Sequence, residues 1–255
     1  EIGYSAFNGT TALTTITIPK TVTTAGNNVF NGSGLKTATI ENGATAVADN
    51  LFSNAKNLTK VTIPNTVKKV GSMSFYGCKS LSSVTLPNTL TEIGYSAFNG
   101  TTALTTITIP KTVTKAGSDV FEDSGLKTAI IENGATSVPN NLFSKATNLT
   151  QITIPNTVKK IGSMSFYDCT KLSSVTLPNT LTSIETSAFK NCQAMKSITI
   201  PKSVTYFGTT AVGYSDGRVI DGFIIYGYKN TKAQTYATKN KITFKAVQEE
   251  TVPVG

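Results

Sequence analysis

The side chains that most often carry out chemistry in proteins are scarce in this sequence of 255 residues. There is no histidine and no tryptophan, and the three cysteines are Cys78, Cys169 and Cys192. Without histidine, Ser-His-Asp and Cys-His catalytic sites and imidazole metal ligands are excluded. Metal-binding cysteines usually occur in Cys-x-x-Cys pairs, whereas these are 91 and 23 residues apart. We therefore expect compact, buried side chains, with a Cys169–Cys192 disulfide as the open alternative.

The carboxylates are also poorly placed for catalysis. Glu41 and Glu132 occupy equivalent places in the repeats described below, and four repeats at about 4.8 Å each separate them by roughly 19 Å, too far for the paired carboxylates of glycosidases. Asp216-Gly217 and Asp221-Gly222 do not complete a calcium-binding Asp-x-Asp-x-Asp-Gly loop, and turns are the better interpretation. The sequence thus predicts no enzyme, no cofactor and no metal site.

The formal net charge of +9 does not indicate nucleic-acid binding, because Arg218 is the only arginine. Surfaces that read bases depend on the bidentate arginine side chain. The pairs Lys68-Lys69 and Lys159-Lys160 form either a basic patch for acidic glycans and phosphates or a solvated edge, and such charge runs are more often a solvated edge. No apolar run approaches the 18 residues typical of a membrane span, so we expect no membrane insertion.

The elements that carry these residues are defined by a repeat of 22 or 23 residues. Its marker is a phenylalanine, found at Phe7, Phe30, Phe52, Phe75, Phe98, Phe121, Phe143, Phe166 and Phe189. Residues 2–92 also align with 93–183 without gaps, so that a block of four repeats was duplicated. Repeats of this length, with apolar positions in register, are typical of solenoids in which each coil packs on its neighbours.

Each repeat predicts the same path of the chain. Residues 13–18 alternate apolar and polar, which predicts a strand with Ile16 and Ile18 inward and threonines outward. A second, weaker strand is expected at 21–26 and a corner at 27–32, with a short helical turn. Nine stacked coils would give a parallel sheet of roughly 40 Å.

The outward strand residues form the candidate binding surface, a polar and weakly charged strip of the kind that repeat proteins offer to partners. Their threonine column is similar to ice-binding solenoids, but Lys60, Ile130 and Gln151 interrupt it and disfavour that function. The strip consists of Thr15, Thr17, Thr37, Thr39, Lys60, Thr62, Ser83, Thr85, Thr106, Thr108, Thr128, Ile130, Gln151, Thr153, Ser174 and Thr176.

The repeat pattern carries a resemblance to a known family. The pattern Ile-Gly-x-x-Ala-Phe, followed by Leu-x-x-Ile-x-Ile-Pro, as at 93–110, resembles the BspA-type leucine-rich repeat of bacterial surface proteins over about 2–207. The resemblance implies a leucine-rich-repeat solenoid of the α/β horseshoe type, a right-handed coil of about nine units with a parallel sheet. The array would span 1–207, with two four-unit blocks and a further unit.

The end of the chain resembles the cap that closes such arrays. We expect the cap to span 208–247 as a strand, a short helix and a second strand, with 248–255 as a linker or tail. Asn230 is predicted as the helix N-cap, and Ala233, Tyr236 and Ala237 as its buried face.

The resemblance also implies a function. BspA-like proteins act on the bacterial surface, and many bind host matrix proteins or other cells, so we expect an extracellular, monomeric adhesion module that binds host or neighbouring-cell proteins or glycans. The alternative is a spacer that presents another domain of a larger surface or cellulosome-type protein. Because Glu1 enters in mid-repeat without a cap, we expect a fragment of a longer array, with its signal and anchor elsewhere.

Overall fold

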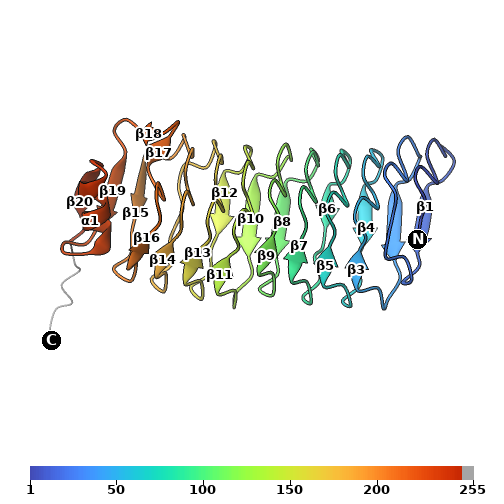
Figure 1. The fold of residues 1–255 in the computed structure, drawn as a ribbon, viewed down its shortest axis with the longest axis horizontal. Helices are drawn as coiled ribbons and strands as arrows, with labels where there is room; N and C mark the ends of the chain where they lie inside the picture. The colour runs from blue at the N-terminus through green and yellow to red at the C-terminus, as the bar shows by residue number, and fades with distance from the viewer. Residues whose placement is uncertain (249–255) are drawn as a thin grey trace.

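The chain folds into an elongated stack of coils. The computed structural model describes residues 1–248, so the predicted linker lies outside the described residues except for Gln248. Figure 1 shows the coils following one another along a single long axis, from β1 at the N-terminal end to α1 and β20 at the C-terminal end. The predicted parallel-strand solenoid is confirmed, with about ten turns of about 23 residues.

One set of strands follows the predicted threonine-rich segments and pairs in parallel from coil to coil. Its members are β1 (Thr15–Ile18), β2 (Thr37–Ile40), β4 (Lys60–Thr62), β6 (Ser83–Val84), β8 (Thr106–Ile109), β10 (Thr128–Ile131), β12 (Gln151–Thr153), β15 (Ser197–Thr199), β19 (Ile224–Gly227) and β20 (Thr243–Ala246). The register keeps equivalent residues side by side, as in Thr15 beside Thr37 and Ile18 beside Ile40.

The prediction of one continuous sheet along this face is wrong. The strands form three sheets, β1-β2-β4-β6, β8-β10-β12 and β15-β19-β20. The first break separates β6 from β8, and the second lies at residues 174–176, which form no strand. Leu86 and Leu177 lie in the two coils at which the sheet is interrupted, each at a position that isoleucine holds in the other repeats. Leucine is less favourable in strands than β-branched isoleucine, which accounts for the weak pairing of these two coils.

The second, weaker strand is confirmed in eight coils, but in the first repeat residues 21–26 form no strand and make only an isolated bridge between Ala25 and Ile2. These strands are β3 (Ala46–Val47), β5 (Lys69–Val70), β7 (Glu92–Ile93), β9 (Lys115–Ala116), β11 (Ser137–Val138), β13 (Lys160–Ile161), β14 (Ser183–Ile184) and β16 (Tyr206–Phe207). They pair in parallel as β3-β5-β7-β9 and β11-β13-β14-β16. In Figure 1 this second ladder runs below the first, along the same axis.

Glycines after the second strands bring neighbouring coils very close together. The N–H of Gly117 donates to the oxygen of Ile93 (2.8 Å), and a Cβ at Gly117 would lie 2.4 Å from the nitrogen of Tyr95. Between β9 and β11 the ladder is open, and there Pro139 occupies the glycine position. Since proline has no N–H to donate, this hydrogen bond cannot form.

The core of the solenoid is a continuous stack of the marker phenylalanines. Adjacent rings are stacked, with centroids between 5.0 and 5.7 Å apart. The predicted helical turn at this corner is wrong: around Phe30, Asn28 and Gly32 have φ values of 58° and 67°. The same left-handed conformation recurs two residues before and after the phenylalanine in the other repeats. The corner is therefore a tight turn that directs each ring inward.

The cap continues the sheet and adds a helix. Strand β19 pairs in parallel with β15 and β20 pairs in parallel with β19, and α1 (Lys232–Lys239) connects β19 to β20. The predicted buried face of Ala233, Tyr236 and Ala237 is confirmed. The N-cap is Thr231, and Asn230 precedes it with a φ of 60°, so the predicted cap residue is wrong by one position.

A small hairpin precedes the cap strands. It pairs β17 (Tyr214–Ser215) with β18 (Arg218–Val219) in antiparallel fashion. Asp216 and Gly217 form its turn, both with positive φ, which is typical of two-residue hairpin turns. Asp221-Gly222 also lies in a turn. The interpretation of both Asp-Gly pairs as turns is therefore confirmed.

The side chain of Tyr236 closes the last coil. At the phenylalanine corner of the array, backbone N–H groups of each coil donate hydrogen bonds to carbonyl oxygens of the next coil, as the N–H of Phe189 does to the oxygen of Ala211 (2.9 Å). Val212 stands where the next phenylalanine would be, and its N–H and C=O both bond to the Tyr236 hydroxyl, at 3.3 and 3.2 Å. The Tyr236 ring stacks on Phe207, with centroids 4.6 Å apart.

Candidate functional site

The predicted strip is exposed along the first set of strands. Fifteen of its sixteen residues are exposed and Thr128 is half-buried. Alternate strand residues face inward, as Ile107 and Ile109 do in β8. The structure does not hold the strip residues in one sheet, because they are divided between β1-β2-β4-β6 and β8-β10-β12. Thr85, Ser174 and Thr176 lie outside the strands.

The middle of the strip contains a groove that the sequence did not predict. It has a volume of about 510 Å³ and lies where β6 and β8 separate. The predicted strip residues that it brings together are Ser83, Thr85, Thr106, Thr108, Thr128 and Ile130. The sequence feature that could have indicated this groove is Leu86, which replaces the usual isoleucine and itself lines the groove.

Ile130 is the most exposed apolar residue that lines this groove. It is 42% exposed and stands between Thr108 and Thr153 in the strand register. The equivalent residue of the first block is Thr39, so the two blocks differ at this place between a hydroxyl and an aliphatic side chain. A large exposed aliphatic side chain among hydroxyls can make a desolvated contact with a partner.

The carboxylate that lines the groove has a structural role. One oxygen of Glu132 accepts the N–H of Lys111 (2.9 Å), and Glu41 accepts that of Lys20 in the same way (2.8 Å). Both glutamates occupy the place of the proline that follows the strand in most repeats. They thus tie one coil to the preceding loop.

The cysteines are buried, free thiols, as expected, and the alternative disulfide is not formed. Each Sγ donates to the phenylalanine oxygen of the preceding coil, at 3.0 Å for Cys78, 3.1 Å for Cys169 and 3.2 Å for Cys192. Burial raises the pKa of all three, that of Cys192 to about 12. These thiols therefore stay protonated and join neighbouring coils.

The lysine pairs lie on the second ladder. Lys69 and Lys160 form ion pairs with Glu92 and Glu185, both with N–O distances of 3.1 Å. Lys68 and Lys159 are exposed. Partial neutralisation in the same ladder favours the solvated edge over a basic patch.

Openings in the second ladder repeat with the duplication. One of about 370 Å³ involves residues 23–25, 46–49 and 69, and another of about 510 Å³ involves 114–116, 137–140 and 160. The second set follows the first by the 91-residue shift. Both lie where neighbouring second segments are not paired, one between residues 23–25 and β3 and the other between β9 and β11. The same missing pairing therefore produces an opening in each block.

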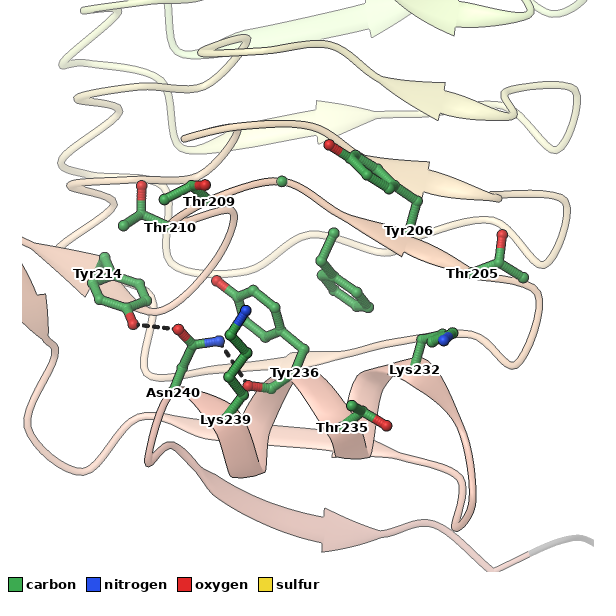
Figure 2. A pocket seen from close by; sticks show the side chains of 12 residues that line it. Thr205, Tyr206, Thr209, Thr210, Tyr214, Lys232, Thr235, Tyr236, Lys239 and Asn240 are labelled. Atoms are coloured by element: carbon green, nitrogen blue, oxygen red, sulfur yellow. Dashed lines mark hydrogen bonds between the residues drawn. The ribbon is translucent and has the colours of Figure 1, made fainter.

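A pocket of about 400 Å³ lies between the last coil and α1 (Figure 2). It was not predicted, because helix and coil residues far apart in sequence contribute to it. The sequence feature that could have indicated this pocket is Tyr206, an aromatic residue at an outward position of the second ladder. Burial raises the pKa of Tyr236, which lines this pocket, to about 12.

Two classes of site are not found in the part of the chain that the structure describes. No group of three or more histidine, cysteine, aspartate or glutamate residues among 1–248 could hold a metal ion. Over the same residues, no helix has the length and apolar character needed to cross a membrane.

Comparisons with known proteins agree with the coil geometry. The family model described as "BspA type Leucine rich repeat region (6 copies)" matches residues 1–127 and 117–243. It describes a structural repeat and no catalytic domain. A search of curated protein sequences gave no match.

Solved structures of bacterial repeat proteins are similar to the chain. A leucine-rich repeat protein from Eubacterium ventriosum is 32% identical, with a TM-score of 0.61 over 84% of this chain and 67% of its own. A leucine-rich repeat protein of T. pallidum is 22% identical, with a TM-score of 0.46 over 67% of this chain and 70% of its own. A leucine-rich cell surface protein from Faecalibacterium prausnitzii is 20% identical, with a TM-score of 0.41 over 87% of this chain and 85% of its own. With its family match across most of its length, the chain belongs to the BspA-type leucine-rich repeat proteins.

Proposed function

We propose that the chain is a non-enzymatic recognition module on a bacterial surface and that it binds a protein of a host or neighbouring cell through the strip. Membership of the BspA-type family supports the surface location. The observation that carries the proposal is the groove at the middle of the strip, with Ile130 exposed on its lining.

The chemistry of the strip suits a protein partner. Lys60 is its single charged residue, and the others are hydroxyls, one amide and one aliphatic side chain. Removing such neutral groups from water costs less than removing charges, and the cores of protein interfaces are depleted of charge. From β1 to β12 the strip is roughly 30 Å long at about 4.8 Å per coil, which suits an extended contact.

The duplication favours a second candidate function, a spacer that holds another domain away from the cell. Residues 93–183 repeat 2–92 in register, so one block adds roughly 19 Å of length at about 4.8 Å per coil. A role in setting length would depend on the number of coils and not on the residues of the strip.

Attachment of cells that display the chain to immobilised fibronectin or fibrinogen separates the two functions. One variant changes Lys60, Thr62, Gln151 and Thr153 to Glu, and another changes Ile130 alone to Glu. If the strip binds the partner, four negative charges that become buried in the interface, or one beside the groove, should reduce attachment by about tenfold or more. The matched control changes Ser137 and Ser183 to Glu, since both are outward residues of the second ladder.

A deletion of 93–183 tests the spacer. It preserves the register, because Ile184 then follows Glu92 as Ile93 does now. If the chain is a recognition module, the strip variants should lose attachment while the control variant keeps it. Full attachment of the strip variants, with a loss in the deletion, would instead establish the spacer.

A further inference from the structure

The pocket beside α1 has a composition unlike the rest of the surface. Its walls come from the last coil, with Tyr206, and from the helix, with Lys232, Tyr236 and Lys239. In Figure 2, Tyr206 lies on the coil across the pocket from α1, and Lys239 rises from the helix beside Tyr236. The pocket is thus built from an aromatic side and a cationic side.

The cationic side is not neutralised within the described chain. No aspartate or glutamate lines the pocket, and neither Lys232 nor Lys239 forms an ion pair with a described residue. Lys232 is also the first residue of α1, whose first turn contains no acidic residue. A cation is unfavourable at a helix N-terminus, which attracts anions. Helix stability therefore does not explain this lysine, whereas an anionic ligand would.

The aromatic side is exposed without a packing reason. Tyr206 is 50% exposed and stands at the outward position of the second ladder, which Ser183 holds one coil earlier and Lys160 two coils earlier. No other described coil has an aromatic residue at this position. A half-exposed ring offers a flat apolar face with a polar tip.

Hydroxyl groups complete the lining, from Thr205, Thr209, Thr210 and Thr235. The hydroxyls of Thr205 and Thr235 donate to backbone oxygens and that of Thr210 bonds to the Ser187 hydroxyl, so they offer a ligand mainly their acceptor lone pairs. The Tyr214 hydroxyl is already bound to Asn240 (2.7 Å), and Asn240 also donates to the oxygen of Tyr236 (2.8 Å). These bonds hold the back of the pocket in place, so the site is formed before a ligand arrives. A volume of about 400 Å³ lies within the range of small-molecule sites, too small for a folded partner.

We propose that this pocket binds an acidic monosaccharide unit, a pyranose that carries a carboxylate. Its carboxylate pairs with the amine of Lys239, its ring lies on Tyr206, and its hydroxyls bond to the threonines, while Lys232 adds positive charge at the other end of the helix. Charge and ring recognition together distinguish it from neutral sugars and from small inorganic anions. The site is separate from the strip, so one can fail without the other.

Titration of the full chain followed by NMR provides the test, with glucuronic acid, galacturonic acid and N-acetylneuraminic acid as probes. Methyl glucoside and inorganic phosphate are the neutral and the ring-free comparisons. We expect millimolar binding of at least one acidic sugar, weakened several-fold between about 0.05 and 0.3 M salt because exposed charges are screened. Tyr206→Ala and Lys239→Gln should each weaken it by about tenfold, whereas Tyr206→Phe should retain most of it.

Matched controls lie outside the pocket. Tyr95→Ala removes an equally exposed tyrosine (50%), and Lys229→Gln removes a nearby exposed lysine; both should bind as the parent does. The proposal is overturned if no acidic sugar binds at about 50 mM, if methyl glucoside or phosphate binds equally well, or if Tyr206→Ala has no effect. Strip variants should leave sugar binding unchanged, and pocket variants should leave attachment to fibronectin unchanged, which keeps the two proposals distinguishable.

Discussion

Removal of one ring from the middle of the phenylalanine stack should strongly destabilise the solenoid. Phe98 is completely buried, and its centroid lies 5.1 Å from that of Phe75 and 5.5 Å from that of Phe121. Replacement of a buried phenylalanine by alanine costs about 3–5 kcal/mol, and each aromatic pair contributes about 0.5–1.5 kcal/mol of its own. We therefore expect Phe98→Ala to lower the free energy of unfolding by about 4 kcal/mol.

The first ring of the stack provides the matched control. Phe7 is half-buried and has one ring neighbour, Phe30, at 5.2 Å. Phe7→Ala removes the same atoms but only one aromatic pair and less buried area. Its cost should be about 1–2 kcal/mol, at most half of that at Phe98.

Urea unfolding followed by far-UV circular dichroism and tyrosine fluorescence measures both variants, since the chain has no tryptophan. Because coils contact only their neighbours, the Phe98 variant should also unfold less cooperatively, with a lower slope of free energy against urea. Equal losses at Phe98 and Phe7, or a loss below about 1 kcal/mol at Phe98, would refute the argument that the stack is the continuous core.

Three further outcomes follow from backbone geometry and burial. Met164 has a φ of 54°, so Met164→Asn should raise the free energy of unfolding by about 0.5–1 kcal/mol; thermal melting measures it, and a decrease would contradict strain at this position. Gly117→Ala should cost about 1–3 kcal/mol because its Cβ would meet Tyr95; a neutral result in urea unfolding would show that the coils can separate freely. The pKa of Cys192 is raised to about 12, so its stabilising contribution is complete below the ordinary thiol pKa of about 8.5 and is lost as the pH rises from there towards 12. Urea midpoints should accordingly fall from pH 7 to pH 10 more in the parent than in Cys192→Ala, and rapid reaction of the native thiols with a disulfide reagent at pH 8 would contradict their burial.

Much of the solenoid could be predicted because its inward positions repeat in register. The alternation in segments such as 13–18 defined the strands and the exposed strip, and the spacing of the phenylalanines defined the coils. Side chains with one periodic environment are predictable in this way, since each coil imposes the same packing on the next. The burial of Cys192 also followed from its place in a column of compact side chains, whereas its free thiol did not, since a disulfide with Cys169 remained the alternative.

The irregular features could not be predicted from the repeat alone. Leu86 and Leu177 keep the apolar column, yet β6 does not pair with β8 and residues 174–176 form no strand, because pairing depends on small differences in strand preference. The corner around Phe30 has left-handed residues where we expected a helical turn, and Asn230 occupies such a conformation in place of capping α1. The pocket at Tyr206 depends on how α1 packs on the last coil, which no periodic pattern specifies.

The hydroxyl of Tyr236 has a consequence for assembly. A stack of identical coils has no intrinsic length, because the last coil presents the same N–H and C=O groups to which another coil would attach, and exposed edges of this kind recruit further chains. A single hydroxyl can act as donor and acceptor at once, and here it occupies both groups of Val212. At the phenylalanine position of this corner, the N–H that would attach a further coil is thereby bonded within the chain, and another coil could pair there only by displacing the Tyr236 hydroxyl.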